Sequence, residues 1–316
     1  MATIEEIFKK HKKSLSPMSL KQYVNTINGV LGQLKTDDYK ILYKNPQEII
    51  KKLRETYDNN NTLKNKTASI ISFLKCLEIE SPKDKKEINE AIERYADLVD
   101  ICSSKIHKAL IKNKKTEEQN ENWMSVDDYE NLKKILMDEI PNTINTSKDL
   151  IKIRNAVLFH LYDDIPSRLD MADAKILYKT KASPKLSKEF NYIVLDKTDK
   201  TAEYYLNKYK TEGTYGKKKI AINSDLYDLL DKYKKALAKF NKENWLFLNN
   251  NATDKLSRNN LGITYSNLGK KIGKKMTATL NRHIKVSQNI DMDKVHSLAD
   301  KMGHSVNEAL KVYAKK

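Results

Sequence analysis

Apolar residues recur every three or four positions through the first 110 residues, which is the spacing of one buried face of an α-helix. Residues that favour helix starts divide this pattern: Ser16 or Ser19 opens one helix, and Asn45 with Pro46 opens another. The Asn59-Asn60-Asn61 segment predicts a loop, and Pro82 predicts the end of the helix that follows that loop. The region therefore predicts a small helical bundle.

The pattern breaks after residue 110. Residues 111–122 have no apolar periodicity and predict a linker between two domains. Helical spacing returns after Ser125, a second helix-capping residue, and residues 150–162 predict a strongly apolar helix. We therefore expect a helical domain over 1–110, a linker over 111–122 and a second domain over 123–316.

A β pattern occurs only within the second domain. Residues 191–195 and 202–209 predict a hairpin, and 219–222 predict a third strand. Lys210 follows the hairpin, in a turn where it could reach a ligand. Further helices are expected over 226–240, 257–272 and 276–286. The predicted fold class is mainly α with a small antiparallel β-sheet, in two domains.

The last fourteen residues combine helix-capping and reactive side chains. Ser305 and Glu308 form the S-x-x-E capping pattern that starts a helix. His304 precedes this cap, and Tyr313 lies two turns beyond it. Helical side chains lean toward the N-terminus, so the Tyr313 hydroxyl would approach His304 if the chain bends there. This segment predicts a nucleophile and its partner.

Composition adds a strong positive charge. The 316 residues have a formal net charge of +17, which indicates a polyanionic partner, usually nucleic acid. A general lysine bias, as an AT-rich genome gives, is the alternative explanation. That bias does not explain the arginines, whose planar guanidinium binds phosphate bidentately. There are six: Arg54, Arg94, Arg154, Arg168, Arg258 and Arg282.

Several functional classes lack their sequence signals. Cys76 and Cys102 have no metal-binding spacing and are typical of reduced core residues in an intracellular protein. Scattered histidines and the missing P-loop and dinucleotide motifs predict no metal, no cofactor and no small-molecule substrate. No stretch approaches the roughly 18 apolar residues of a membrane span, so no membrane partner is expected. The N-terminus predicts an amphipathic helix rather than a signal peptide.

One set of residues shares a single chemical logic. Phosphoryl transfer without a metal must offset negative charge on the phosphate with cationic side chains. A tyrosine nucleophile would give a covalent intermediate that conserves bond energy, so strands are rejoined without ATP. The residues that could do this are Arg168, Lys210, Arg282, His304 and Tyr313.

In this order, Arg…Lys…Arg-His…Gly-His…Tyr over residues 124–316, the chain resembles the catalytic domain of the tyrosine recombinase (phage integrase) family. The Gly-His-Ser before the tyrosine helix and the interval from His304 to Tyr313 carry most of the resemblance. Residues 1–110 are similar in pattern to the core-binding domain of that family. The Pro-Ser-Arg-Leu-Asp phrasing resembles the branch found in large DNA viruses and their satellite elements, so a viral or mobile genetic element is implied.

The resemblance implies a site-specific recombinase or integrase that acts on double-stranded DNA. Tyr313 would attack the scissile phosphate and form a 3′-phosphotyrosine, while Arg168 and Arg282 hold the non-bridging oxygens. Lys210 would protonate the leaving 5′-oxygen, and His304 would hydrogen-bond a non-bridging oxygen. The family implies a homo-tetramer on two DNA sites, located wherever the target DNA is: host cytoplasm, nucleus or viral factory.

Three departures from the family pattern stand out. Thr279 occupies the position of a usual histidine, so Thr279 and the neighbouring His283 are auxiliary candidates. Met171 stands where the family has an acid, with Asp170 one residue earlier. Three residues follow Tyr313, whereas many relatives have a C-terminal helix that docks on the next protomer. Assembly would then use another surface, or the chain is shortened.

Each residue also has a plainer interpretation. Arg168 could pair with Asp170 or Asp173, Tyr313 could be a packing residue, and His304 a capping or core histidine. Lys208 or Lys217–Lys219 could replace Lys210. Lysines of the first domain and linker are candidate DNA contacts, namely Lys64, Lys66, Lys75, Lys105, Lys108 and Lys112.

Two other functions remain open. A type IB DNA topoisomerase uses the same chemistry on one duplex. With Thr279 in place of histidine and a short C-terminus, the chain could instead be a catalytically inactive DNA-binding protein.

Overall fold

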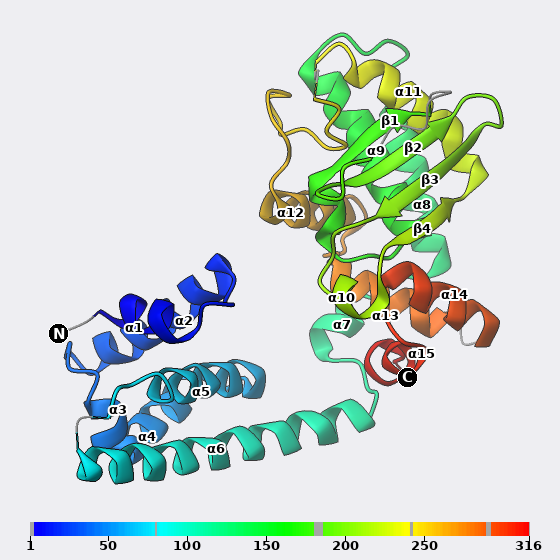
Figure 1. Ribbon diagram of the computed structural model, residues 1–316. Coiled ribbons are helices and arrows are strands. Elements are labelled where there is room, and N and C mark those ends of the chain that lie inside the picture. The colour runs from blue at the N-terminus through cyan, green and yellow to red at the C-terminus, as the bar shows by residue number, and fades with distance from the viewer. Residues whose placement is uncertain (1–2, 80, 180–185, 241–242, 289–291, 316) are drawn as a thin grey trace. The chain divides into compact units, whose positions relative to one another are not determined.

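The computed structural model describes residues 3–79, 81–179, 186–240, 243–288 and 292–315. The chain forms two compact units, Met1–Lys112 and Asn113–Lys316 (Figure 1). The first unit is helical over its described residues, and the second adds one four-stranded sheet to its helices. The predicted class, mainly α with a small sheet, is confirmed.

The helices of the first unit begin at the capping residues that the sequence indicates. Ser16 accepts a hydrogen bond from the Ser19 amide, so Ser16 caps the second helix. Asn59 caps the fifth helix, which leaves a shorter loop than three asparagines predict. The helices are α1 (Ile4–His11), α2 (Pro17–Gln33), α3 (Ile41–Lys44), α4 (Pro46–Thr56), α5 (Asn60–Leu74) and α6 (Pro82–Ile111).

The core of this unit forms where α5 packs along the long helix α6. Phe8, Ile27 and Phe73 are fully buried there. Tyr95 on α6 is also buried, and its Oη donates to the Leu42 carbonyl at 2.8 Å, which joins α6 to α3. Apolar burial supplies the main stabilisation, and this bond satisfies the one polar atom of the Tyr95 side chain.

The second unit is built around α9, whose side chains are buried on most sides. Its α-helices are α7 (Glu117–Asn122), α8 (Val126–Asp138), α9 (Ser147–Asp164), α10 (Glu212–Tyr215), α11 (Tyr227–Leu237), α12 (Arg258–Gly269), α13 (Ala278–Gln288), α14 (Met292–Met302) and α15 (Val306–Glu308). Shorter helical turns are η1 (Leu169–Asp173), η2 (Ser224–Leu226), η3 (Lys270–Ile272) and the π-helical η4 (Ala309–Tyr313).

The sheet is mixed rather than purely antiparallel, which corrects the prediction. Its strands follow chain order: β1 (Ala174–Tyr178), β2 (Asn191–Asp196), β3 (Thr201–Leu206) and β4 (Lys218–Ile222). The hairpin of β2 and β3 and the antiparallel β4 agree with the sequence pattern. The sequence pattern does not predict β1. This strand pairs in parallel with β2, so its ladder of hydrogen bonds depends on a strand that is not joined to it by a hairpin.

Residues 117–122, which lie in the segment expected to be a linker, form α7. Thr116 and Gln119 make a reciprocal capping box that starts this helix. The Asn122 side chain accepts from the Lys275 amide at 2.6 Å, and Glu118 pairs with Lys275 at 3.3 Å. Polar contacts within the second unit therefore hold α7, which is why apolar periodicity does not predict it.

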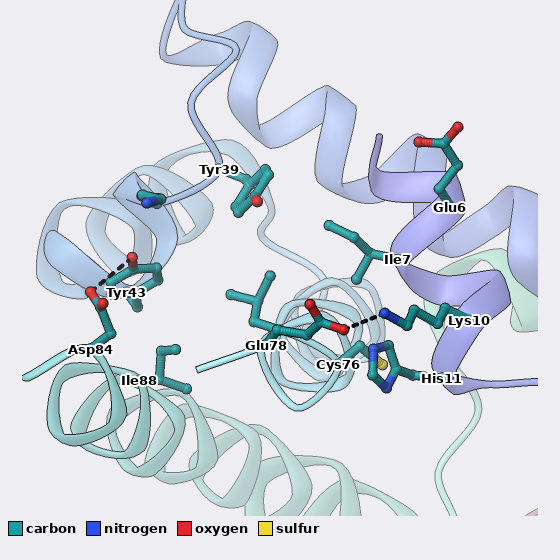
Figure 2. A pocket seen from close by; sticks show the side chains of 12 residues that line it. Glu6, Ile7, Lys10, His11, Tyr39, Tyr43, Cys76, Glu78, Asp84 and Ile88 are labelled. Carbon is teal, nitrogen blue, oxygen red and sulfur yellow. Dashed lines mark hydrogen bonds and ion pairs between the residues drawn. The ribbon is translucent and has the colours of Figure 1, made fainter. Parts of the chain in front are cut away.

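The first unit contains a hollow of about 300 Å³ beside Cys76 (Figure 2). Acidic groups on its wall are already engaged by neighbours: Glu78 pairs with Lys10, and Asp84 accepts from Tyr43 at 3.4 Å. The carboxylates of Glu78 and Asp84 are therefore both paired already, and neither is available to a cationic ligand. No helix among the described residues is long and apolar enough to cross a membrane.

Candidate active site

A glycine turn positions His304. Gly303 has φ +69°, and the backbone amides of Gly303 and His304 donate to the carbonyls of Asp300 and Ala299 at 3.0 Å each. This is the glycine-ended termination that closes a helix, here α14. Ser305 then accepts from the Glu308 amide at 3.1 Å and starts α15, as the capping pattern predicts. His304 is thereby fixed in the turn between α14 and α15.

Tyr313 folds back onto this turn. Its Oη lies 3.4 Å from Nε2 of His304, although nine residues separate them. The chain covers that interval with α15 and the wider π-turn η4, in place of a straight α-helix. Tyr313 is 6% exposed and belongs to a small apolar cluster with Val286, Val295 and Met302.

His304 is buried and its two ring nitrogens have different neighbours. Nδ1 lies 3.3 Å from a carboxylate oxygen of Glu308, which can only accept, so we take Nδ1 as the protonated nitrogen, although the two atoms are not aligned as a hydrogen bond. Nε2 is then free to accept the Tyr313 hydroxyl proton. Burial lowers the pKa of His304, and the charge of Arg168 acts in the same direction, whereas Glu308 opposes both.

Arg282 lies against the face of Tyr313. Its guanidinium carbon is 4.9 Å from the ring centroid, within the range of a cation–π contact. Nε donates to the Ala278 carbonyl at 3.3 Å, and Nη2 donates to the Thr279 hydroxyl at 3.2 Å. Burial lowers the pKa of Arg282, while the Tyr313 phenol raises it and Arg168 lowers it. The Thr279 hydroxyl therefore orients the Arg282 guanidinium by accepting this hydrogen bond.

Arg168 caps η1 directly after α9. Its carbonyl accepts from the hydroxyls of Tyr162 at 3.0 Å and Ser167 at 2.9 Å. The acids that could have paired with Arg168 have other partners: Asp170 pairs with Arg258 at 3.1 Å, and Asp173 pairs with a lysine. Arg168 is thus not committed to either carboxylate.

The two arginines each keep a free donor. Among the described residues, Nη1 of Arg168 and Nη1 of Arg282 are buried without a hydrogen-bond partner. Unpaired buried donors are costly, at roughly 1–3 kcal/mol each. Both side chains line a groove of about 450 Å³, together with Thr279 and Arg258. Two such donors at one groove are suited to an anion with several oxygens, such as a phosphate diester.

Lys210 is exposed in the connection between β3 and β4. Its two neighbours bind the turn that carries His304: Thr211 Oγ1 donates to the Gly303 carbonyl at 2.8 Å, and the Tyr209 ring packs on Gly303. The loop that bears Lys210 is therefore anchored beside His304. Of the competing lysines, Lys218 and Lys219 already pair with Asp300 and Glu203.

His283 and Ser287 on α13 hold the far side of the Tyr313 segment. His283 Nδ1 lies 3.1 Å from the Tyr313 carbonyl, so this nitrogen donates. Ser287 Oγ accepts from the Lys315 amide at 2.8 Å. Burial lowers the pKa of His283, although its bond to Tyr313 raises it. His283 thus contacts the backbone carbonyl of Tyr313, and its ring lies 5.2 Å from the Tyr313 ring.

The groove also contains Arg258, which the family pattern does not select. It begins α12 and carries the charge that Asp170 balances. The scarcity of arginine in the sequence is a signal that points to it. The same signal also points to Arg154, which is structural: it is buried, and Nη1 donates to the Leu248 carbonyl at 2.6 Å.

The six candidate DNA-contacting lysines lie in the first unit and are described separately from this site. Lys75, Lys105, Lys108 and Lys112 are exposed, and Lys64 is partly buried. Lys66 is also partly buried, and its Nζ donates to Thr26 at 3.4 Å. No group of three or more His, Cys, Asp or Glu that could hold a metal occurs among the described residues.

Comparisons with known proteins find a weak structural likeness. No protein-family model matches the chain, and no curated protein matches it significantly. A solved structure titled "Crystal structure of XerA recombinase" is similar with a TM-score of 0.44 and 12% sequence identity. The similarity covers 98% of this chain and 92% of that chain. At this identity and score, function has to be argued from the site itself.

We expect Gly303→Ala to destabilise the fold and displace His304. The left-handed backbone costs a non-glycine residue roughly 1–2 kcal/mol, and an added Cβ would lie 2.6 Å from the Tyr209 ring. Gly273→Ala is the matched control, because Gly273 has φ +73° with open space around its Cβ position. Urea unfolding should show the larger loss for Gly303→Ala; an equal loss would contradict the close contact.

Stability should fall as the pH drops below the ordinary histidine pKa of 6.5. The pKa of His304 is lowered in the folded chain, so below that pH the unfolded chain binds a proton that the folded chain refuses. His304→Gln should flatten this slope, and the slope that remains belongs to His160 and His283, whose pKa values burial also lowers. Urea unfolding at several pH values measures it. Identical slopes for wild type and His304→Gln would contradict the lowered pKa of His304.

Proposed function

We propose that this chain is a tyrosine-type site-specific DNA recombinase, which cuts and rejoins double-stranded DNA through a 3′-phosphotyrosyl intermediate. One observation carries the proposal: the Tyr313 hydroxyl lies 3.4 Å from His304 Nε2 and its ring lies against Arg282, which lines one groove with Arg168, and within the described part of the chain both arginines keep an unpaired buried donor. A phenol next to a proton acceptor, with cationic donors free to bind oxygens, is suited to attack on a phosphate diester.

The reaction follows from these positions. Tyr313 Oη bonds to phosphorus as its proton leaves toward His304 Nε2, and the bond from phosphorus to the 5′-oxygen breaks. Arg168 and Arg282 hold the non-bridging oxygens, where charge accumulates in the transition state. Lys210 gives a proton to the departing 5′-oxygen. The reverse sequence, with a new 5′-hydroxyl as attacking group, rejoins the strand.

We propose that the positive charge of the protein drives its binding to the duplex. The net charge of +17 favours DNA, and the exposed lysines on α6 and at the end of α5 are proposed to contact its phosphates. Such contacts give affinity that falls steeply with salt and carry no sequence information. A tetramer on two sites is proposed as the active assembly, in which two duplexes exchange strands.

Incubation with nicked duplexes from the ends of its own genetic element should yield an SDS-resistant protein–DNA adduct. The nick lets the short 5′ product diffuse away, so the covalent intermediate accumulates. Tyr313→Phe should bind DNA with unchanged affinity and form no adduct, because only the nucleophilic oxygen is lost. Peptide mapping of the adduct measures the attachment site.

Other outcomes favour the other functions. Wild-type protein that binds DNA and never forms an adduct would contradict the enzymatic proposal and favour an inactive DNA-binding protein. Rapid relaxation of plasmids of any sequence, without strand exchange between two sites, would favour a type IB topoisomerase.

Lys210→Ala should slow cleavage by about 100-fold, since a positioned general acid contributes about that much. A duplex with sulfur in place of the bridging 5′-oxygen should restore the rate, because a thiolate leaves without protonation. Lys200→Ala is the control, since Lys200 is exposed on the turn between β2 and β3 and is not a candidate for the acid role. Single-turnover adduct formation measures both substrates. Equal defects of Lys210→Ala on oxygen and sulfur substrates would rule out the acid role.

A further inference from the structure

A hydrogen-bond chain runs through the core beneath the two arginines. Tyr162, on the last turn of α9, is fully buried, as is Tyr129 on α8 to within a few per cent. Between them lies Asn281, which precedes Arg282 on α13 and is 1% exposed. These three side chains belong to three helices, and none of them reaches the groove.

Each bond in the chain has a defined direction. Tyr129 Oη donates to Asn281 Oδ1, and Asn281 Nδ2 donates to the Tyr162 carbonyl at 2.7 Å. Tyr162 Oη then donates to the Arg168 carbonyl at 3.0 Å. Burial raises the pKa of both tyrosines far above the usual range, so their hydroxyls remain protonated donors.

This hydrogen-bond chain connects two elements that each carry a positively charged arginine. Arg168 lies on the turn after α9 and Arg282 lies on α13, and the charge of Arg168 lowers the pKa of Arg282. Successive residues of a helix point about 100° apart, so Asn281 can face α9 while Arg282 faces Tyr313. A fixed spacing matters, because displacement of a catalytic group by 1 Å can cost about 100-fold in rate.

We propose that Tyr162 is a positioning residue, which with Asn281 sets the spacing of Arg168 and Arg282 around one bound phosphate group. This inference rests on the proposed function only for the identity of the substrate. Tyr162 supplies a bond at each end: its carbonyl receives α13, and its hydroxyl holds the backbone of Arg168.

Tyr162→Phe removes one of these two bonds and keeps the ring that packs 4.9 Å from Tyr265. The Ser167 hydroxyl still donates to the Arg168 carbonyl at 2.9 Å, so the turn remains folded. We expect about a tenfold loss in the single-turnover rate of adduct formation, the size that loss of one hydrogen bond can give. DNA affinity should not change, because the lysine contacts are intact.

Tyr233→Phe is the matched control. Tyr233 is also fully buried, and its Oη donates to the Leu246 carbonyl at 2.6 Å. Both variants lose a buried hydroxyl–carbonyl bond in the same unit, so both should lower the unfolding temperature by similar amounts. Only Tyr162→Phe should slow cleavage. Equal rates for the two variants would overturn the inference and leave Tyr162 a structural residue.

A second measurement separates this inference from the proposed function. The chain has six arginines, so their Nε–H signals can be resolved by NMR and followed during titration with orthovanadate. Vanadate should shift the Arg168 and Arg282 signals together in wild type and in Tyr233→Phe. Its affinity should fall about tenfold in Tyr162→Phe.

These arms give distinct results. Paired vanadate shifts in a wild type that forms no DNA adduct would overturn the recombinase proposal and support the positioning role. Adduct formation with identical vanadate affinity in both variants would overturn the positioning role alone. A wild type that binds no vanadate at either arginine would also overturn it, because no oxyanion would then be held between them.

Discussion

Two guanidinium groups of like charge, that of the buried Arg282 and that of the half-buried Arg168, line one groove of the second unit. Burial disfavours the charge of Arg282 and the proximity of Arg168 disfavours it further, as the lowered pKa of Arg282 records. Among the described residues, neither arginine pairs with a carboxylate, and Asp170 pairs with Arg258 instead. Polar contacts to backbone and hydroxyl groups hold them instead. The free-energy cost of this arrangement is tolerated where the surrounding packing fixes the positions of the side chains.

The surroundings of the two arginines also bear on the protonation state of His304. A histidine buried beside cations is neutral near pH 7, and its protonated Nδ1 faces Glu308. A neutral imidazole can accept a proton from Tyr313, which a charged one cannot. Burial, aided by the charges of Arg168 and Arg282 and opposed by Glu308, thus keeps the neighbouring base unprotonated.

Local signals in the sequence predict much of this fold and some of the site. Ser16, Ser125 and Ser305 each cap a helix in the structure, because capping depends on residues only three positions away. The closeness of His304 and Tyr313 follows from the same local pattern. What the sequence does not predict depends on distant partners. Strand β1 is completed by β2, and helix α7 is held by Lys275.

The same distinction separates the residues to which the sequence points from those to which it does not. Arg168 and Arg282 are identified by order along the chain, and the structure brings both to one groove. Tyr162 and Asn281 have no such signal, since a tyrosine at the end of an apolar helix is expected to pack. Thr279 stands where the resemblance leads us to expect a histidine, and only the bond to Arg282 shows what its hydroxyl contacts.

The small apolar cluster around Tyr313 lies apart from the main core of its unit, and this separation has a dynamic consequence. Segments with few buried contacts open locally, at a free energy well below that of global unfolding. Release of η4 from Val286 and Met302 would expose Tyr313 while the main core of the unit stays folded. Changes within this cluster would therefore alter how often Tyr313 leaves its position more than they alter the packing of the main core.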